Sequence, residues 1–176
     1  MKTLKKIILS IITVFSILSC AQNPKMNTDE ASNLATYSET IDTSWTKKII
    51  KTDAQWKSIL TSEQFTITRE QGTEQPFTHD FHNLKENGIF ICLSCNNPLF
   101  SKDTKFDSGT GWPSFFKPEE DERIEYIEDK SFGMVRVEVN CKRCGSHLGH
   151  VFDDGPSPTK LRYCINSLSL KLDKSD

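Results

Sequence analysis

The amino-acid sequence predicts a mainly β domain of antiparallel strands, with two short helices before the first strand. The strand pattern occurs in three segments, which are residues 89–92, 134–140 and 161–172. In the second segment Val135, Val137 and Val139 alternate with other residues, as in a strand that presents one apolar face. The third segment is dominated by residues that fit a pleated surface. A length of 176 residues allows one domain of this kind with a real core.

The N-terminal residues have the pattern of an export signal. Residues 1–20 hold three lysines, then an apolar run, then Ser19 and Cys20. The apolar run is about a dozen residues, short of the roughly 20 that a membrane-spanning helix needs. Because Ile17–Cys20 resembles a bacterial lipobox, we expect residues 1–19 to be a lipoprotein signal peptide and Cys20 to be lipidated. The protein would then be exported and anchored in the bacterial cell envelope; simple secretory cleavage near the same place is the alternative.

A tether is expected after this segment. Residues 20–45 are polar, with few apolar residues and neither a helical nor a strand period, which is typical of a flexible tether. The folded domain is therefore expected at residues 46–173. Without residues 1–19 the formal charge of −2 becomes −5, because that segment carries three lysines and no acidic residue. An acidic chain without a basic cluster argues against a nucleic-acid partner.

The two helices are expected at about residues 53–60 and 62–70. Thr52 and Thr61 each precede a glutamine by three residues, which is the pattern of a capping box. Trp56, Ile59 and Leu60 would supply an apolar face to the first helix. Residues 72–86 have no period and contain glycine and proline, so they predict a loop.

Two Cys-x-x-Cys pairs predict a metal site. Cys92 and Cys95 follow one predicted strand, and Cys141 and Cys144 follow another. Four thiolates are the ligand set of a structural zinc ion, so we expect one Zn²⁺ that joins two hairpins. Two disulfides are an alternative in an exported protein, and a thioredoxin-like redox motif is another. A zinc ion with four thiolate ligands has no open position, so catalytic chemistry would lie elsewhere.

Cys164 is the cysteine outside these pairs and the lipobox, and it is a candidate nucleophile. Arg162 would share its face of a strand, where a fixed positive charge favours the thiolate. His147 and His150, on an expected glycine-bearing turn, could move protons near neutral pH. The alternative is a buried structural cysteine, which is a common role for a free cysteine.

The segment Ser108-Gly-Thr-Gly-Trp-Pro-Ser-Phe115 predicts a rigid loop. Its two glycines and its proline restrict the backbone path and would hold Trp112 in a fixed place. Trp112 could therefore form the wall of a pocket, although an isolated aromatic residue is more often part of a core.

Together these segments resemble the B-type peptide-methionine (R)-S-oxide reductases. The resemblance rests on four features, which are residues 108–115, the two cysteine pairs, Gly145-Ser-His-Leu-Gly-His-Val-Phe152 and Leu161-Arg-Tyr-Cys-Ile-Asn-Ser167. Residues 68–77 agree with it as well. The resemblance implies the antiparallel, Mss4-like fold of that family with its structural zinc, and reduction of peptide-bound methionine-R-sulfoxide in oxidised proteins.

The resemblance also implies roles for individual residues. Cys164 would attack the sulfoxide sulfur and become a sulfenic acid, and reductases of this class act on one sulfoxide epimer. His147 and His150 would supply protons to the oxygen, and Trp112 would pack on the substrate methyl group. Arg162 would favour the thiolate, and Asn166 would orient donors in the same pocket.

One position departs from the family pattern. Many members have a resolving cysteine where this chain has Thr110, so an external thiol reductant, such as a thioredoxin-like protein, is expected to regenerate Cys164. We expect the domain to act as a monomer. Two other classes of function compete with this reading. One is a binding module stabilised by zinc, and the other is a hydrolase that uses Cys164, His150 and Asn166.

Overall fold

The computed structural model describes residues 46–174. The predicted signal peptide, the lipidation of Cys20 and the tether lie outside these residues. Two helices come first, α2 (Asp53–Lys57) and α3 (Ser62–Arg69). The strands that follow are β1 (Ile89–Cys92), β2 (Pro98–Ser101), β3 (Lys105–Phe106), β4 (Ser114–Phe115), β5 (Ile124–Asp129), β6 (Arg136–Cys141), β7 (His147–Phe152), β8 (Arg162–Ile165) and β9 (Leu170–Asp173).

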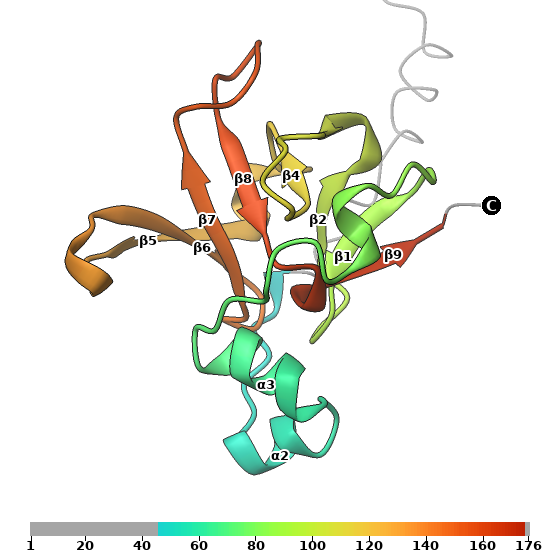
Figure 1. Cartoon of the computed structure of the whole chain (residues 1–176). Coiled ribbons are helices and arrows are strands. Elements are labelled where there is room, and N and C mark those ends of the chain that lie inside the picture. The colour runs from blue at the N-terminus through green and yellow to red at the C-terminus, as the bar shows by residue number, and fades with distance from the viewer. Residues whose placement is uncertain (1–45, 175–176) are drawn as a thin grey trace, which may run out of the picture. The chain divides into compact units, whose positions relative to one another are not determined.

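The strands form two antiparallel sheets (Figure 1). The smaller sheet has the order β2-β1-β9, and the larger has the order β3-β4-β8-β7-β6-β5. This confirms the mainly β, antiparallel class. Within the described part of the chain, none of the helices has the length and apolar character needed to cross a bilayer.

Both predicted capping boxes are present. Thr52 and Thr61 accept hydrogen bonds from the backbone amides of Gln55 and Gln64, and each glutamine side chain accepts from the backbone amide of its threonine. The first helix is shorter than predicted and ends at Lys57. Its apolar face is also smaller than predicted, because Ile59 lies beyond the helix and is 57% exposed.

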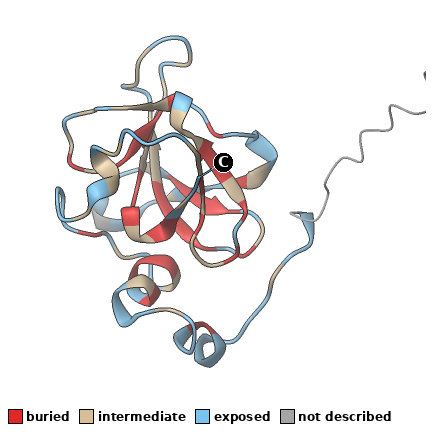
Figure 2. Cartoon of the chain, turned by 90° about the vertical axis from the view of Figure 1, so that its right-hand side faces the viewer, coloured by how far each residue is buried: buried red, intermediate tan, exposed pale blue. Residues whose placement is uncertain are grey.

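One side of each helix is buried while the other faces solvent (Figure 2). Trp56 of α2 and Phe65 of α3 are both in the core cluster. The guanidinium of Arg69 lies 4.0 Å from the centre of the Trp56 ring, a cation–π contact that joins the two helices.

The predicted strand 161–172 is two strands in different sheets. β8 belongs to the large sheet and β9 to the small one, with a 3₁₀ turn at Ser167–Ser169 between them. The turn is held by the buried carboxylate of Glu74, which accepts from the backbone amides of Ser167 at 2.7 Å and Leu168 at 2.9 Å. A distant side chain therefore decides where the strand is interrupted.

The predicted strand 134–140 corresponds to β6, but its valine face is only partly in the core. Val139 is fully buried, whereas Val137 is 40% exposed and Val135 is 73% exposed. The reason is that β5 and β6 form a hairpin that projects from the body of the domain (Figure 1). The valine side chains near the end of this hairpin are therefore exposed, since no second layer of residues 46–174 covers them.

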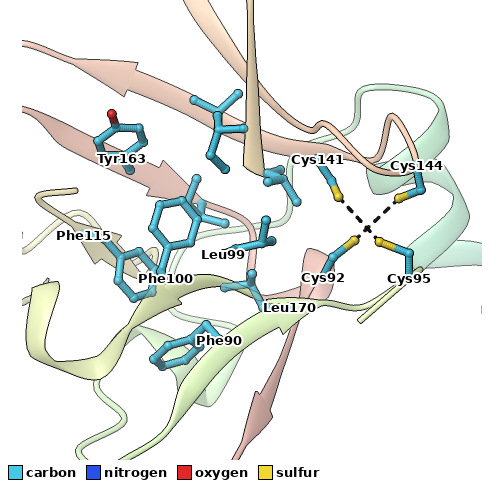
Figure 3. Close-up of a cluster of buried hydrophobic side chains, with 14 of the residues drawn as sticks. Phe90, Cys92, Cys95, Leu99, Phe100, Phe115, Cys141, Cys144, Tyr163 and Leu170 are labelled. Carbon is cyan, nitrogen blue, oxygen red and sulfur yellow. Dashed lines mark hydrogen bonds between the residues drawn. The ribbon is translucent and has the colours of Figure 1, made fainter. Parts of the chain in front are cut away.

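The core lies between the two sheets and is rich in aromatic residues (Figure 3). Phe100 stacks on Phe115 at 4.5 Å between ring centres, and Phe90 meets Phe115 edge to face at 5.0 Å. Tyr163 and Ile165 of β8 point into this core. Since side chains alternate along a strand, Arg162 and Cys164 are on the opposite face of β8. Core packing thus determines which face carries the thiol.

Candidate active site and metal site

The four paired cysteines come together at the ends of two strands. Cys92 ends β1 and Cys141 ends β6, and each is followed by a tight turn that carries the second cysteine. All four are buried (Figure 3). The Sγ atoms of Cys92 and Cys144 are 3.7 Å apart, and those of Cys95 and Cys141 are 3.6 Å apart.

These separations match a tetrahedral metal site. Four sulfurs at about 2.3 Å from one ion would lie about 3.8 Å from each other. A disulfide requires about 2.05 Å, so these thiols are not paired as disulfides. Further donors point at the sulfurs, since Arg69 Nη2 lies 3.5 Å from Cys144 Sγ and Asn97 Nδ2 lies 3.5 Å from Cys141 Sγ. Such donors stabilise coordinating thiolates. The residues therefore fit a bound metal ion.

Cys164 lies in the centre of the large sheet. Its partners across the neighbouring strands are Ser114 of β4 and His150 of β7. Cys164 and His150 are therefore neighbours across β7 and β8.

His147 and His150 lie on β7 and not on a turn, so the predicted backbone of this segment was wrong. Asn140 pairs with His147 while Val139 pairs with Gly149, so Leu148 is an extra residue in the ladder. This bulge brings the two imidazoles to one side of the strand, with ring centres 5.6 Å apart. Gly149 is required because a Cβ at this position would lie 2.0 Å from the Cys164 carbonyl oxygen.

Each imidazole is hydrogen-bonded to a carboxylate from the β5–β6 hairpin. His150 Nε2 lies 2.8 Å from Asp129 Oδ2, and His147 Nδ1 lies 2.6 Å from Glu138 Oε1. Since an ionised carboxylate only accepts hydrogen bonds, these two nitrogens carry the protons. Arg136 Nη2 donates to the same Asp129 oxygen at 2.6 Å.

Asp129 is a strong acceptor. Hydrogen bonds from the Ser131 hydroxyl and amide, followed by those from His150 and Arg136, hold the pKa of Asp129 well below its usual range. It therefore remains ionised at neutral pH and fixes the orientation of the His150 ring. The pKa of His147 is also lowered, but by burial, which disfavours the charged imidazolium. The hydrogen bond to Glu138 offsets part of this shift.

The Cys164 thiol lines a cavity of about 160 Å³. Trp112 and Phe152 supply aromatic surface to it, and His150 and Arg136 supply polar groups. His147 does not line this cavity, although its ring packs against that of His150. The position of Trp112 is therefore compatible with its predicted role as a pocket wall. Of the two histidines, His150 shares the cavity with the thiol and His147 does not.

The Trp112 loop is tied down on both sides. The Ser108 hydroxyl lies 2.8 Å from the hydroxyls of Thr110 and Ser114, and Trp112 Nε1 donates to the Glu74 carbonyl at 3.1 Å. Gly111 has a φ of +88° and contacts Phe77, so a side chain would not fit there. The loop is as constrained as the sequence predicted.

Arg162 affects Cys164 less than the sequence suggested. Its guanidinium donates to Asp154 through Nε at 2.8 Å and Nη2 at 2.9 Å, and it stacks on Phe152. Burial raises the pKa of the Cys164 thiol, and the charge of Arg162 together with hydrogen bonds from Thr110 and Arg162 offsets only part of this. Desolvation of the thiolate outweighs the nearby cation in the free protein.

Asn166 lines the cavity, but its side chain is engaged elsewhere. Its Nδ2 donates to the Leu148 carbonyl at 3.0 Å, and its Oδ1 accepts from the Glu74 amide at 3.1 Å. The amide therefore connects β7, β8 and the segment at Glu74, and it is not bonded to either imidazole.

Sequence analysis did not identify Asp129, Arg136, Glu138 or Glu74. A signal was present for Arg136 and Glu138, since alternation in β6 puts them on the face opposite the valines. Asp129 lies on a strand that the sequence did not predict, and Glu74 acts through a contact with residues 92 or more positions away.

Comparisons with known proteins agree with this arrangement. A SelR domain model matches residues 60–174. The chain is 54% identical to a protein of Methanosarcina mazei over 73% of this chain and 92% of that protein. It is 56% identical to one from Saccharophagus degradans, over 70% and 92%, and 53% identical to one from Pseudomonas putida, over 74% and 99%. Each of the three is named peptide methionine sulfoxide reductase MsrB. The chain therefore belongs to the SelR domain family.

Proposed function

We propose that this protein reduces methionine-R-sulfoxide in peptides and oxidised proteins, with Cys164 as the nucleophile. The observation that carries the proposal is the position of the Cys164 thiol in a cavity that is lined by the aromatic rings of Trp112 and Phe152 and by His150, its partner across the strands. The sulfoxide of methionine likewise has one apolar group, its methyl group, and one polar group, its oxygen, which is a strong hydrogen-bond acceptor. The relatives' names identify the substrate class.

The chemical step transfers one oxygen atom. The Cys164 thiolate attacks the sulfinyl sulfur, the S–O bond of the substrate breaks, and the oxygen, with one proton, ends on Cys164 as a sulfenic acid. Methionine leaves as the thioether, so the substrate sulfur gains the two electrons that Cys164 loses. Charge grows on the oxygen during this step. Because the Nε2 proton of His150 is held by Asp129, the other ring nitrogen, Nδ1, takes the proton of the Cys164 thiol and then passes it to the oxygen.

The remaining site residues support this step. Trp112 and Phe152 bind the methyl group while His150 binds the oxygen, and separate fixed sites for these two groups distinguish the two epimers. His147 holds the His150 ring by packing, and Asn166 holds β7 beside β8. Arg162 offsets part of the desolvation of the thiolate.

Regeneration of Cys164 requires an external thiol. The neighbour of Cys164 at the position of the family's resolving cysteine is Thr110, whose hydroxyl hydrogen-bonds to the thiol. The other cysteines of the described residues belong to the metal site. One reductant thiol displaces the sulfenic oxygen as water, and a second thiol releases Cys164, as a thioredoxin-like protein would do.

The metal is proposed to be one structural zinc ion. Four thiolates in tetrahedral arrangement favour zinc, and they leave no position for substrate. The ion would join β1 to β6 and so hold the two sheets together. It takes no part in the reaction.

The N-terminal predictions complete the proposal. A lipid on Cys20 and a tether to residue 45 would hold a monomeric domain in the cell envelope, where an exported reductant would be needed. Labelling cells with a fatty-acid analogue tests this point. A wild-type protein without label, or a Cys20→Ala variant that still carries it, would contradict lipidation.

A hydrolase that uses Cys164, His150 and Asn166 is disfavoured by the hydrogen bonds of the site. His150 is oriented by Asp129, and both polar ends of the Asn166 amide are occupied by the backbone. The test is turnover of peptides that contain each epimer of methionine sulfoxide, with dithiothreitol as the reductant. The R epimer should be reduced by the wild type and not by Cys164→Ser with its metal retained; reduction by that variant would refute the proposal.

A further inference from the structure

A second cavity, of about 250 Å³, lies directly beside the Cys164 cavity. The two share three lining residues, which are Thr73, Arg136 and His150. The other residues of the second cavity come from the end of α3, from the β5–β6 hairpin and from the start of β7. Nothing in the reaction of Cys164 uses this space. A peptide that places a methionine side chain in the first cavity would bring a flanking side chain to the second.

The lining of this second cavity has an excess of negative charge. Glu70, Asp129 and Glu138 supply three carboxylates, and Arg136 is the guanidinium that faces them. Arg136 is bound to Asp129, at 2.6 Å. Glu138 is buried, and its hydrogen bonds come from the imidazole of His147 and from the side-chain amides of Gln71 and Asn140. Among residues 46–174, no lysine or arginine forms an ion pair with Glu138, and its only ion-pair partner is His147, whose pKa burial lowers.

An unpartnered ring nitrogen lines the same cavity. The His147 side chain is 4% exposed, and its Nε2 has no hydrogen-bond partner in the described part of the chain. Its Nδ1 carries the proton that goes to Glu138, so Nε2 presents a lone pair. A buried acceptor of this kind needs a donor, and a donor with a positive charge would satisfy both Nε2 and the carboxylates.

We propose that this cavity is a subsite for a lysine or arginine side chain that flanks the methionine sulfoxide in a substrate peptide. The proposal rests on the function proposed above and adds a sequence preference to it. Glu70 is the residue best suited to test it. Its carboxylate is exposed at the C-terminal cap of α3, where the helix dipole does not favour an acid, so its replacement should leave the fold intact.

The experiment compares peptides that differ in one residue next to the methionine sulfoxide. At the position directly before it, and separately at the position directly after it, this residue is lysine, glutamine or glutamate. For at least one position, the wild type should have a kcat/KM about threefold to tenfold higher with lysine than with glutamine, and glutamate should be poorest. The preference should weaken as salt is added. Glu70→Gln should reduce it and Glu70→Lys should abolish or invert it.

Two controls separate this subsite from other effects. Glu63→Gln removes an acid from the other end of α3, which is not part of this cavity, and should leave the preference unchanged. N-acetyl methionine sulfoxide has no flanking side chain, so wild type and Glu70 variants should reduce it equally. Equal rates for all peptides, or a preference that survives in Glu70→Lys, would refute the subsite. Failure to reduce any sulfoxide would instead refute the proposed function.

Discussion

Cys164 and His150 are directly opposite each other in the antiparallel ladder of β7 and β8. Side chains in such a pair have Cβ atoms about 5 Å apart, so an oxygen bound beside the sulfur is within reach of the imidazole. Asp129 holds the same imidazole from β5, two strands beyond β7. The site is therefore built across neighbouring strands of one sheet, which makes its geometry as rigid as the sheet itself.

Asp129→Asn should slow the chemical step. An asparagine can present its amide nitrogen to His150 Nε2 and so favour the wrong tautomer, and it loses the ion pair with Arg136. We expect the rate of a single turnover with the R-sulfoxide to fall by about tenfold to a hundredfold. Glu128→Gln is the matched control, since Glu128 is the adjacent residue, on the other face of β5, and pairs with Lys130. Equal rates in the two variants would contradict the role of Asp129.

Cys164 should react with iodoacetamide at a higher pH than an ordinary thiol. Burial raises its pKa, so half of it becomes thiolate only at a pH above that of an exposed cysteine. Arg162→Gln removes a charge that lowers this pKa, and should move the alkylation midpoint further upward. Arg162→Lys keeps the charge and should restore part of the shift. Mass spectrometry of the peptide that contains Cys164 measures the reaction, and a downward shift in Arg162→Gln would be inconsistent with this electrostatic role.

Thr110→Cys should create an internal resolving thiol. The Thr110 side chain hydrogen-bonds to the Cys164 thiol, so a cysteine at position 110 would be close to the sulfenic sulfur. One turnover without reductant should leave a disulfide between positions 110 and 164 in the variant. The wild type should instead retain one extra oxygen on Cys164 and form no internal disulfide with it. Such a disulfide in the wild-type protein would contradict the need for an external thiol.

Loss of the metal should destabilise the domain without involving the thiol of the active site. Cys95→Ser removes one of the four ligands, and the remaining three buried thiols no longer enclose the ion. Structural zinc contributes on the order of 10 kcal/mol to folding, so we expect the Tm to fall by more than about 10 °C. Metal analysis should find one zinc ion per chain in the wild type and in Cys164→Ser. A Cys95→Ser protein with unchanged Tm would argue against a structural metal.

Short-range patterns in the chain were enough to predict several parts of the structure. The capping boxes at Thr52 and Thr61 depend on residues three positions apart, and the strand at residues 89–92 depends on its own side chains. The cysteine pairs likewise contain their ligand spacing within four residues. These features need no information from the rest of the chain, because the interactions that produce them are local.

The other features depend on contacts between distant segments. The glycine at position 149 suggested a turn where the structure has β7. This residue is glycine because the Cys164 carbonyl oxygen approaches it too closely for a side chain. Asp129 and Glu138 reach the two histidines only because β5 and β6 fold beside β7. The pKa of Cys164 depends on how deeply β8 is packed, and burial outweighs the sequence neighbour Arg162. Side-chain spacing thus predicted the candidate groups, but desolvation and cross-strand hydrogen bonds, which require the assembled sheet, set their pKa values and orientations.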